Sequence, residues 1–191
     1  VREDLTFPNE DPKDEVGSDN SLWNHGDTPK ERWNRGNKIE SSEIERISRR
    51  ERGKGYEVDI PNNMQRGYDM LTFSNTANSV KVWQIFSLNA LMDSYKNNPT
   101  AVRRKAEAQL KNMPVIGSKV TFGSANAARE VRELLIIVVV PENSPVWLES
   151  LESELNQKHS FGGSRFLIVR GYGDYNEKSD VDINSVDNSK Q

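Results

Sequence analysis

The run Leu134–Val140 constrains the fold more than any other stretch of the chain. It consists of seven consecutive aliphatic residues, and Pro141 ends it. An apolar run without alternation is typical of a strand that is covered on both faces. A helix is predicted over 144–158, and Phe166–Val169 is predicted to form a second apolar strand. A strand, a helix of this length and another strand make a crossover unit, whose two strands are parallel.

Weaker patterns surround this unit. Alternating apolar residues predict strands at 56–60 and 68–73, and a stretch that is apolar around most of its circumference predicts the clearest helix at 78–96. Further predicted elements are a helix at 100–113 capped by Thr100, a strand or bent pair at 115–122 and a short Ala-rich helix at 124–132. We therefore expect an α/β or α+β fold with a small mixed sheet and about four helices.

Composition divides the chain into three predicted parts: a flexible arm with a basic helix at 1–55, a globular α/β domain at 56–175 and an acidic tail at 176–191. Residues 1–27 mix acidic, small polar and Pro residues, and they cannot offset their ordering entropy by burial. Hydrophobic residues make up 34% of the chain, which agrees with a core formed by only part of it.

Two basic blocks lie inside a chain whose net charge is −3. Residues 32–54 carry eight bases and four acids (+4), and residues 99–132 carry seven bases and two acids (+5). Such poles in the electrostatic field influence which partners approach the protein. The alternative is that both blocks are ordinary solvated surface.

A short repeat places Trp23 and Trp33 ten residues apart, each in a Trp-Asn-x-Gly sequence. Tryptophan is uncommon where nothing is buried, and two such anchors on a flexible arm suit docking to a partner. The alternative is that both side chains fold back onto the chain's own domain.

The first basic block contains a capping box at Ser42–Glu45 and a helix with only Ile44 and Ile47 as an apolar stripe. Its candidate contacts to nucleic acid or to an acidic partner are Arg46, Arg49, Arg50, Arg52 and Lys54. A weakly anchored, Arg-rich helix suits a segment that orders against phosphate. An exposed helix with internal pairs such as Glu45–Arg49 explains the same pattern.

The second basic block lies on the predicted helix 100–113, which has a clear apolar stripe and is therefore better anchored. Its outer face carries four further candidate contacts, Arg103, Arg104, Lys105 and Lys111.

Several chemistries are disfavoured. The chain has no cysteine and two histidines, His25 and His159, so neither a thiolate zinc site nor a histidine-based triad is expected. No phosphate-binding glycine motif is present. We predict no catalytic residue, metal ligand or cofactor. The longest apolar run is far shorter than the roughly 20 residues that span a bilayer, and the lack of cysteine favours an intracellular protein.

These observations leave three functional hypotheses. The preferred one is a non-enzymatic interaction or assembly protein, such as an oligomer or a subunit of a larger particle, that docks through Trp23, Trp33 and the basic surfaces. The second is a nucleic-acid-binding protein that uses the basic patches 46–54 and 103–111. The third is a metal-dependent nuclease whose carboxylates the spacing does not identify.

Overall fold

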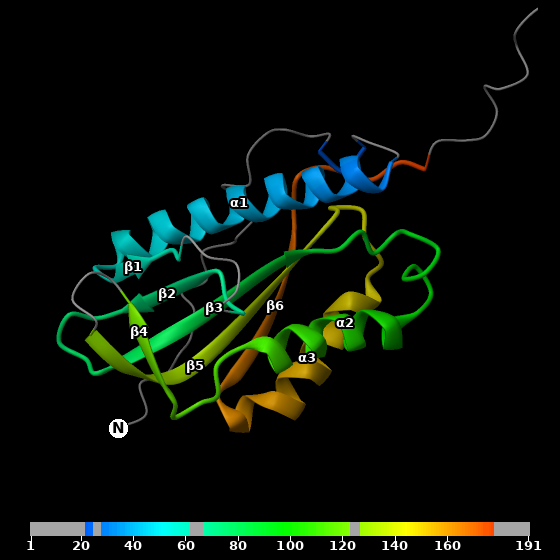
Figure 1. Ribbon diagram of the computed structural model, residues 1–191. Helices are drawn as coiled ribbons and strands as arrows, with labels where there is room; N and C mark the ends of the chain where they lie inside the picture. The colour runs from blue at the N-terminus through cyan, green and yellow to red at the C-terminus, as the bar shows by residue number, and fades with distance from the viewer. Residues whose placement is uncertain (1–21, 25–27, 62–66, 123–126, 178–191) are drawn as a thin grey trace, which may run out of the picture.

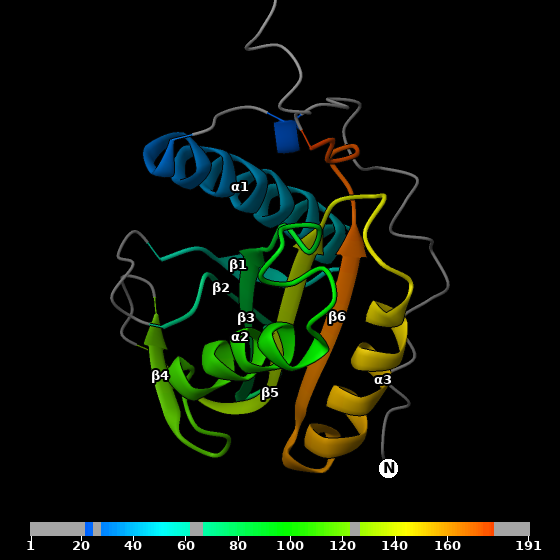
Figure 2. The same ribbon diagram turned by 90° about the vertical axis from the view of Figure 1, so that its right-hand side faces the viewer.

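A computed structural model describes residues 22–24, 28–61, 67–122 and 127–177. The elements in chain order are η1 (Leu22–Asn24), α1 (Pro29–Gly53), β1 (Glu57–Asp59), β2 (Met70–Phe73), β3 (Ser79–Ser87), α2 (Pro99–Asn112), β4 (Lys119–Phe122), β5 (Ala127–Val140), α3 (Trp147–His159), η3 (Ser160–Gly162) and β6 (Ser164–Arg170). They form three layers, with α1 on one face of a six-stranded mixed sheet and α2 and α3 on the other (Figures 1 and 2).

Strand β5 lies at the centre of the sheet, whose order is β1-β2-β3-β5-β4 with β6 also paired to β5. Its neighbours β3 and β6 are parallel to it, and α3 connects β5 to β6. In the β5–β6 register, Leu134 pairs with Ser164 and Val139 pairs with Val169. The predicted crossover unit is therefore confirmed.

Strands β4 and β6 share one edge of β5. Strand β4 is antiparallel to residues 127–130 of β5, whereas β6 pairs with residues 134–140. This division explains why β5 is 14 residues long: its polar first half completes a hairpin, and its apolar second half forms the centre of the sheet.

The apolar run of β5 is buried on both sides. Leu134, Ile136 and Val138 belong to the core beneath α2 and α3, and alternate residues such as Leu135 and Ile137 belong to the core beneath α1. Two helical layers thus account for seven aliphatic residues in succession.

The helix predicted over 78–96 is wrong, because Ser79–Ser87 forms β3. Val82 and Phe86 face the α2–α3 core while Trp83 and Ile85 face α1. A strand buried on both faces and a helix buried all round give the same apolar composition, so periodicity could not separate them. The β-branched residues of this stretch were the signal that favoured a strand.

The short helix predicted over 124–132 is also wrong for the part that the structure describes. Residues 127–132 begin β5 and pair with β4, with Lys119 opposite Glu130 and Val120 opposite Arg129. Hairpin pairing here overrides the helix propensity of the Ala-rich sequence.

The basic stretch is not a separate, weakly anchored helix. Residues 29–53 form the single helix α1, which begins with a capping box of Thr28 and Glu31, so the capping box predicted at Ser42–Glu45 is wrong because these residues lie inside the helix. Gly36 lies inside this helix, and a Cβ there would meet the Ser87 Oγ at 3.0 Å, so glycine permits the close approach of α1 to β3. The described residues therefore contain three α-helices instead of about four, and α1 packs onto the sheet (Figure 1).

Four other predicted elements agree with the structure. The strands β1 and β2 and the helices α2 and α3 lie where they were predicted, although Asn98 and not Thr100 caps α2. Among the described residues, no helix combines the length and hydropathy needed to cross a membrane. Residues 1–21, the first part of the predicted arm, and residues 178–191, most of the predicted tail, lie outside the described part of the chain.

Candidate interaction surface

The two candidate docking tryptophans have different environments. Trp23 is 2% exposed, and its indole N–H donates to the Gly171 carbonyl at 2.8 Å. The Arg35 guanidinium donates to the Trp23 carbonyl at 2.6 Å and lies near its ring. Trp23 therefore folds back onto this chain, as the alternative interpretation held. Trp33 is 63% exposed on α1 and remains a predicted contact.

The first basic block does not present its five cations on one surface. Arg46 is buried and forms a bidentate ion pair with Glu43, whose carboxylate also accepts a hydrogen bond from the Tyr172 hydroxyl at 3.0 Å. Arg50 and Lys54 each lie 3.5 Å from the Glu51 carboxylate. Arg49 and Arg52 are exposed.

The contact between Tyr172 and Glu43 joins the end of β6 to α1. Burial and the neighbouring Glu43 carboxylate raise the pKa of the Tyr172 hydroxyl above its usual value, so this group stays protonated and donates. Tyr172 has φ of 64°, a left-handed conformation that costs energy for a residue with a side chain. The hydrogen bond and burial of the ring hold this conformation.

Helices α2 and α3 lie side by side and run in the same direction. Arg103 of α2 forms an ion pair with Glu154 of α3, and one turn further Glu107 accepts hydrogen bonds from Lys158 at 2.6 Å and His159 at 2.9 Å. Both hydrogen bonds lower the pKa of the Glu107 carboxyl. Lys111 lies one turn beyond Glu107 on α2, toward the turn that precedes β4.

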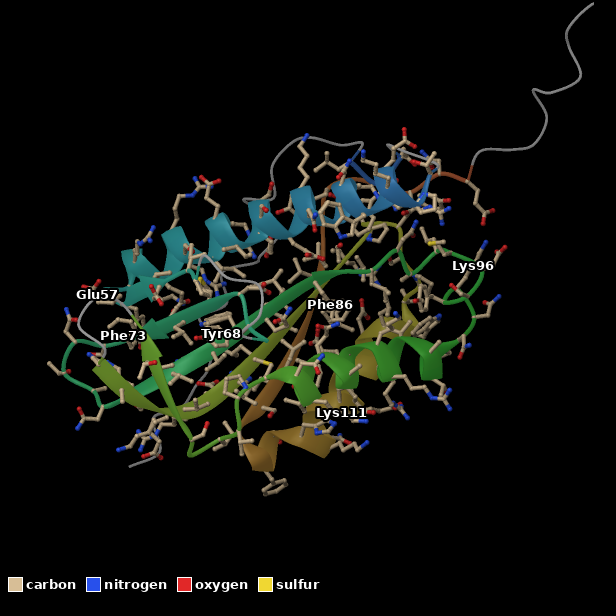
Figure 3. All side chains as sticks on the ribbon, viewed as in Figure 1. Glu57, Tyr68, Phe73, Phe86, Lys96 and Lys111 are labelled. Atoms are coloured by element: carbon tan, nitrogen blue, oxygen red, sulfur yellow. The ribbon has the colours of Figure 1, made fainter. Side chains whose placement is uncertain are left out.

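The outer face of α2 carries three exposed cations, Arg104, Lys105 and Lys111. Figure 3 shows the Lys111 side chain on the side of α2 that faces away from the sheet. Within the part of the chain that the structure describes, none of the three has an ion pair or side-chain hydrogen bond. Arg103, the fourth predicted cation of this helix, is instead taken up by Glu154.

An exposed aromatic ring lies at the end of this face. Phe161 of η3 is 98% exposed, and Val115, in the turn after α2, is 74% exposed. The two turns are neighbours, because a Cβ added at Gly163 would lie 3.3 Å from the Ile116 Cδ1. We call the surface formed by Arg104, Lys105, Lys111, Val115 and Phe161 the α2–η3 face. Its cations were predicted from the sequence, whereas Phe161 was missed.

Two carboxylates lie where β2 leaves the edge of β3. The Asp69 carboxylate accepts from the Ile85 N–H at 2.7 Å, and the Glu40 carboxylate accepts from the Ser87 N–H at 2.9 Å and the Ser87 hydroxyl at 3.0 Å. Burial raises the pKa of both carboxyl groups above their usual range. These side chains replace the missing strand neighbour of β3. In the described ranges, no three His, Asp or Glu side chains come together in a group that could hold a metal ion.

Comparisons with known proteins give little guidance. No family model matches the sequence, and no curated protein matches it. Among solved structures, the chain is similar to the CdiA-CT/CdiI toxin and immunity complex from Yersinia pseudotuberculosis, with 14% sequence identity and a TM-score of 0.39 over 58% of this chain and 86% of that chain. This score is too low to support an argument about fold or function.

Proposed function

We propose that this protein is a non-enzymatic binding protein that docks an acidic macromolecule on its α2–η3 face. The observation that carries the proposal is the arrangement on α2 of three exposed cations, unpaired within the described residues, beside an aromatic ring that is 98% exposed. Charged side chains that have no intramolecular partner keep their full attraction for a ligand of opposite charge.

The electrostatic field supports this choice of surface. The chain has a net charge of −3, but α2 alone carries four bases and one acid (+3). Neighbouring cations on one helix face add their potentials, which raises the association rate of an acidic partner and orients it. The first basic block contributes less to such a field, because Glu43 and Glu51 lie against three of its five cations.

The nuclease hypothesis gains less from the structure. A metal-dependent nuclease needs several ligating carboxylates and a cation that converge on one open site. Glu40 and Asp69 converge, but a backbone amide donates to one oxygen of each carboxylate, and no third ligand joins them among the described residues. The proposal therefore rests on the cationic face. Trp33, exposed on α1 across the sheet from this face, offers a second contact in a larger complex.

Binding of two polyanionic probes, sodium polyglutamate and the oligonucleotide dT20, tests the proposal. The variant Arg104→Glu/Lys105→Glu/Lys111→Glu reverses the three cations of the α2–η3 face. The matched control Lys30→Glu/Arg49→Glu/Arg52→Glu reverses three exposed cations of α1 and changes the net charge by the same amount. Thermal unfolding of both variants checks that each one folds.

We expect the full chain to bind at least one probe in fluorescence anisotropy. The α2 variant should lose about tenfold or more in affinity, and the α1 control should stay within about threefold of the wild type. Equal losses in the two variants would show that only net charge matters, and binding of neither probe would contradict the proposal.

A further inference from the structure

The α2–η3 face carries little apolar surface. Five large hydrophobic side chains are exposed among the described residues: Trp33, Ile60, Val115, Val146 and Phe161. Only Val115 and Phe161 belong to this face. A stable protein–protein interface buries about 800 Å² on each partner around an apolar, well-packed centre. One ring and one valine do not supply such a centre, so the face is poorly suited to a protein partner.

The Phe161 ring is instead suited to stacking on a flat ligand. It is 98% exposed on the single turn η3, and a Cβ added at the next residue, Gly162, would find no atom within 4 Å. Small residues thus flank the ring, and both of its faces are open to water. An accessible aromatic ring beside a basic surface is how proteins hold the bases of single-stranded nucleic acid.

The cations of α2 suit the phosphates of such a strand. Arg104 and Lys111 lie seven residues apart on one helix face, which corresponds to about 10 Å along the axis. Lys105 lies beside them, and the turn that follows α2 lies against Gly163, directly after η3. A row of this length can contact several successive phosphates while a base at its end stacks on Phe161.

On these grounds we infer that the α2–η3 face binds single-stranded nucleic acid, with Arg104, Lys105 and Lys111 on phosphates and Phe161 on an unstacked base. This inference rests on the proposed function and names its partner class. A duplex fits less well, because its bases are already stacked on one another and leave the ring without a ligand.

The experiment uses dT20, a blunt duplex of the same length and polyglutamate as probes of the full-length protein. Phe161→Trp introduces a fluorophore at the stacking position, and Phe161→Leu keeps an apolar side chain that cannot stack. We expect dT20 to quench the fluorescence of the introduced indole after subtraction of the wild-type signal, and we expect polyglutamate to leave it unchanged. Phe161→Leu should weaken dT20 binding by about tenfold.

Salt dependence supplies an independent measurement. If three phosphates are neutralised, the log–log plot of affinity for dT20 against salt should have a slope of about −2, and Lys111→Ala should reduce its magnitude by about 0.7. Phe161→Leu should leave the slope unchanged, because stacking releases no counterions.

The outcomes separate this inference from the proposed function. If polyglutamate binds and only the α2 reversal variant loses it, while dT20 neither binds nor quenches Phe161→Trp, the docking face stands and the partner class is wrong. Tighter binding of the duplex than of dT20, or equal dT20 affinity in Phe161→Leu and the wild type, would also overturn the inference.

Discussion

Trp23 and Trp33 differ in how much each side chain contributes to the packing of the molecule. Both lie in Trp-Asn-x-Gly sequences, yet one is buried against the end of β6 and the other is exposed on α1. The burial of Trp23 depends on Gly171, which is 148 residues away in the sequence. No local pattern carries that information.

This difference predicts opposite effects on stability. Trp23→Ala removes a large buried ring and should lower the free energy of unfolding by about 3–5 kcal/mol. Trp33→Ala should change it by less than about 0.5 kcal/mol, because its ring is 63% exposed. Urea unfolding followed by circular dichroism measures both. Similar losses in the two variants would mean that Trp23 is not packed as described.

Phe161 is the residue of the candidate site that sequence analysis missed. A single aromatic residue between Ser160 and Gly162 has no partner in any periodic pattern, so a periodicity search passes over it. The available signal was the turn itself, since a large apolar side chain in a Gly-rich turn after a helix has no obvious core to enter. The cations of α2 were predictable because they follow the helical period.

At the scale of elements, the free edge of β3 is held by two desolvated carboxylates, Glu40 of α1 and Asp69, which directly precedes β2. Glu40 and Asp69 accept hydrogen bonds from the Ser87 and Ile85 amides, and burial, the largest cause, raises the pKa of both carboxyl groups. Their folded-state pKa values therefore lie above the unfolded ones. As the pH falls, the folded chain therefore takes up protons at a higher pH than the unfolded chain does. The contribution of these two groups to the free energy of unfolding increases as the pH falls through their folded-state pKa values.

We expect the double variant Glu40→Gln/Asp69→Asn to remove this contribution. Between pH 7 and pH 4.5, the wild type should gain stability relative to the variant as the solution becomes more acidic. Urea unfolding of both proteins across this range measures the difference between their free energies of unfolding. The raised pKa of Glu152 and the lowered pKa of Glu107 do not affect this difference, because both proteins share them. A difference that is independent of pH would mean that the two carboxyl groups titrate normally.

Helix α3 protects the outer edge of β6. The Asn156 side chain accepts from the Phe166 N–H at 2.8 Å and donates to the Phe166 carbonyl at 2.9 Å, and the Glu152 carboxylate accepts from the Ile168 N–H at 2.7 Å. These side chains bond the backbone as a neighbouring strand would. They keep the edge of the sheet from pairing with another chain.

Removal of this protection should have a measurable effect. Asn156→Ala leaves both backbone groups of Phe166 unpaired and should cost about 1–3 kcal/mol of stability. It should also raise the tendency to associate through the opened edge, which light scattering at increasing concentration detects. Gln157→Ala, on the exposed side of the same helix, is the matched control. Equal behaviour of the two variants would show that the edge is protected in another way.

The elements that were predicted correctly share one property: their signal is local and unambiguous. The β5–α3–β6 unit has an uninterrupted aliphatic run, a proline stop and a helix of normal length. The prediction for the β3 stretch failed because its neighbours in the fold create the burial that its sequence shows. These neighbours are β2 and β5 within the sheet and α1 above it. The apolar residues of this stretch fit the helical period and the strand period almost equally well, so tertiary packing decided which element formed.

At the scale of the whole molecule, α1 closes one face of the sheet, and the opposite helical layer is left to carry the candidate site (Figure 2). Three of the five cations at 46–54 of α1 lie against Glu43 and Glu51, whereas Arg104, Lys105 and Lys111 of α2 face solvent. Two sequence blocks of similar charge therefore differ in how many of their cations a ligand can reach. That difference depends on which face of each helix packs against the rest of the molecule, and it favours the α2–η3 face over α1 as the binding surface.

Hydrogen–deuterium exchange of the full chain, with and without saturating dT20, tests this selection most directly. The account predicts slower exchange in peptides that cover 104–117 and 160–163, with little change over 45–54 of α1. Slower exchange confined to 45–54, or no change anywhere in the chain at saturation, would contradict it.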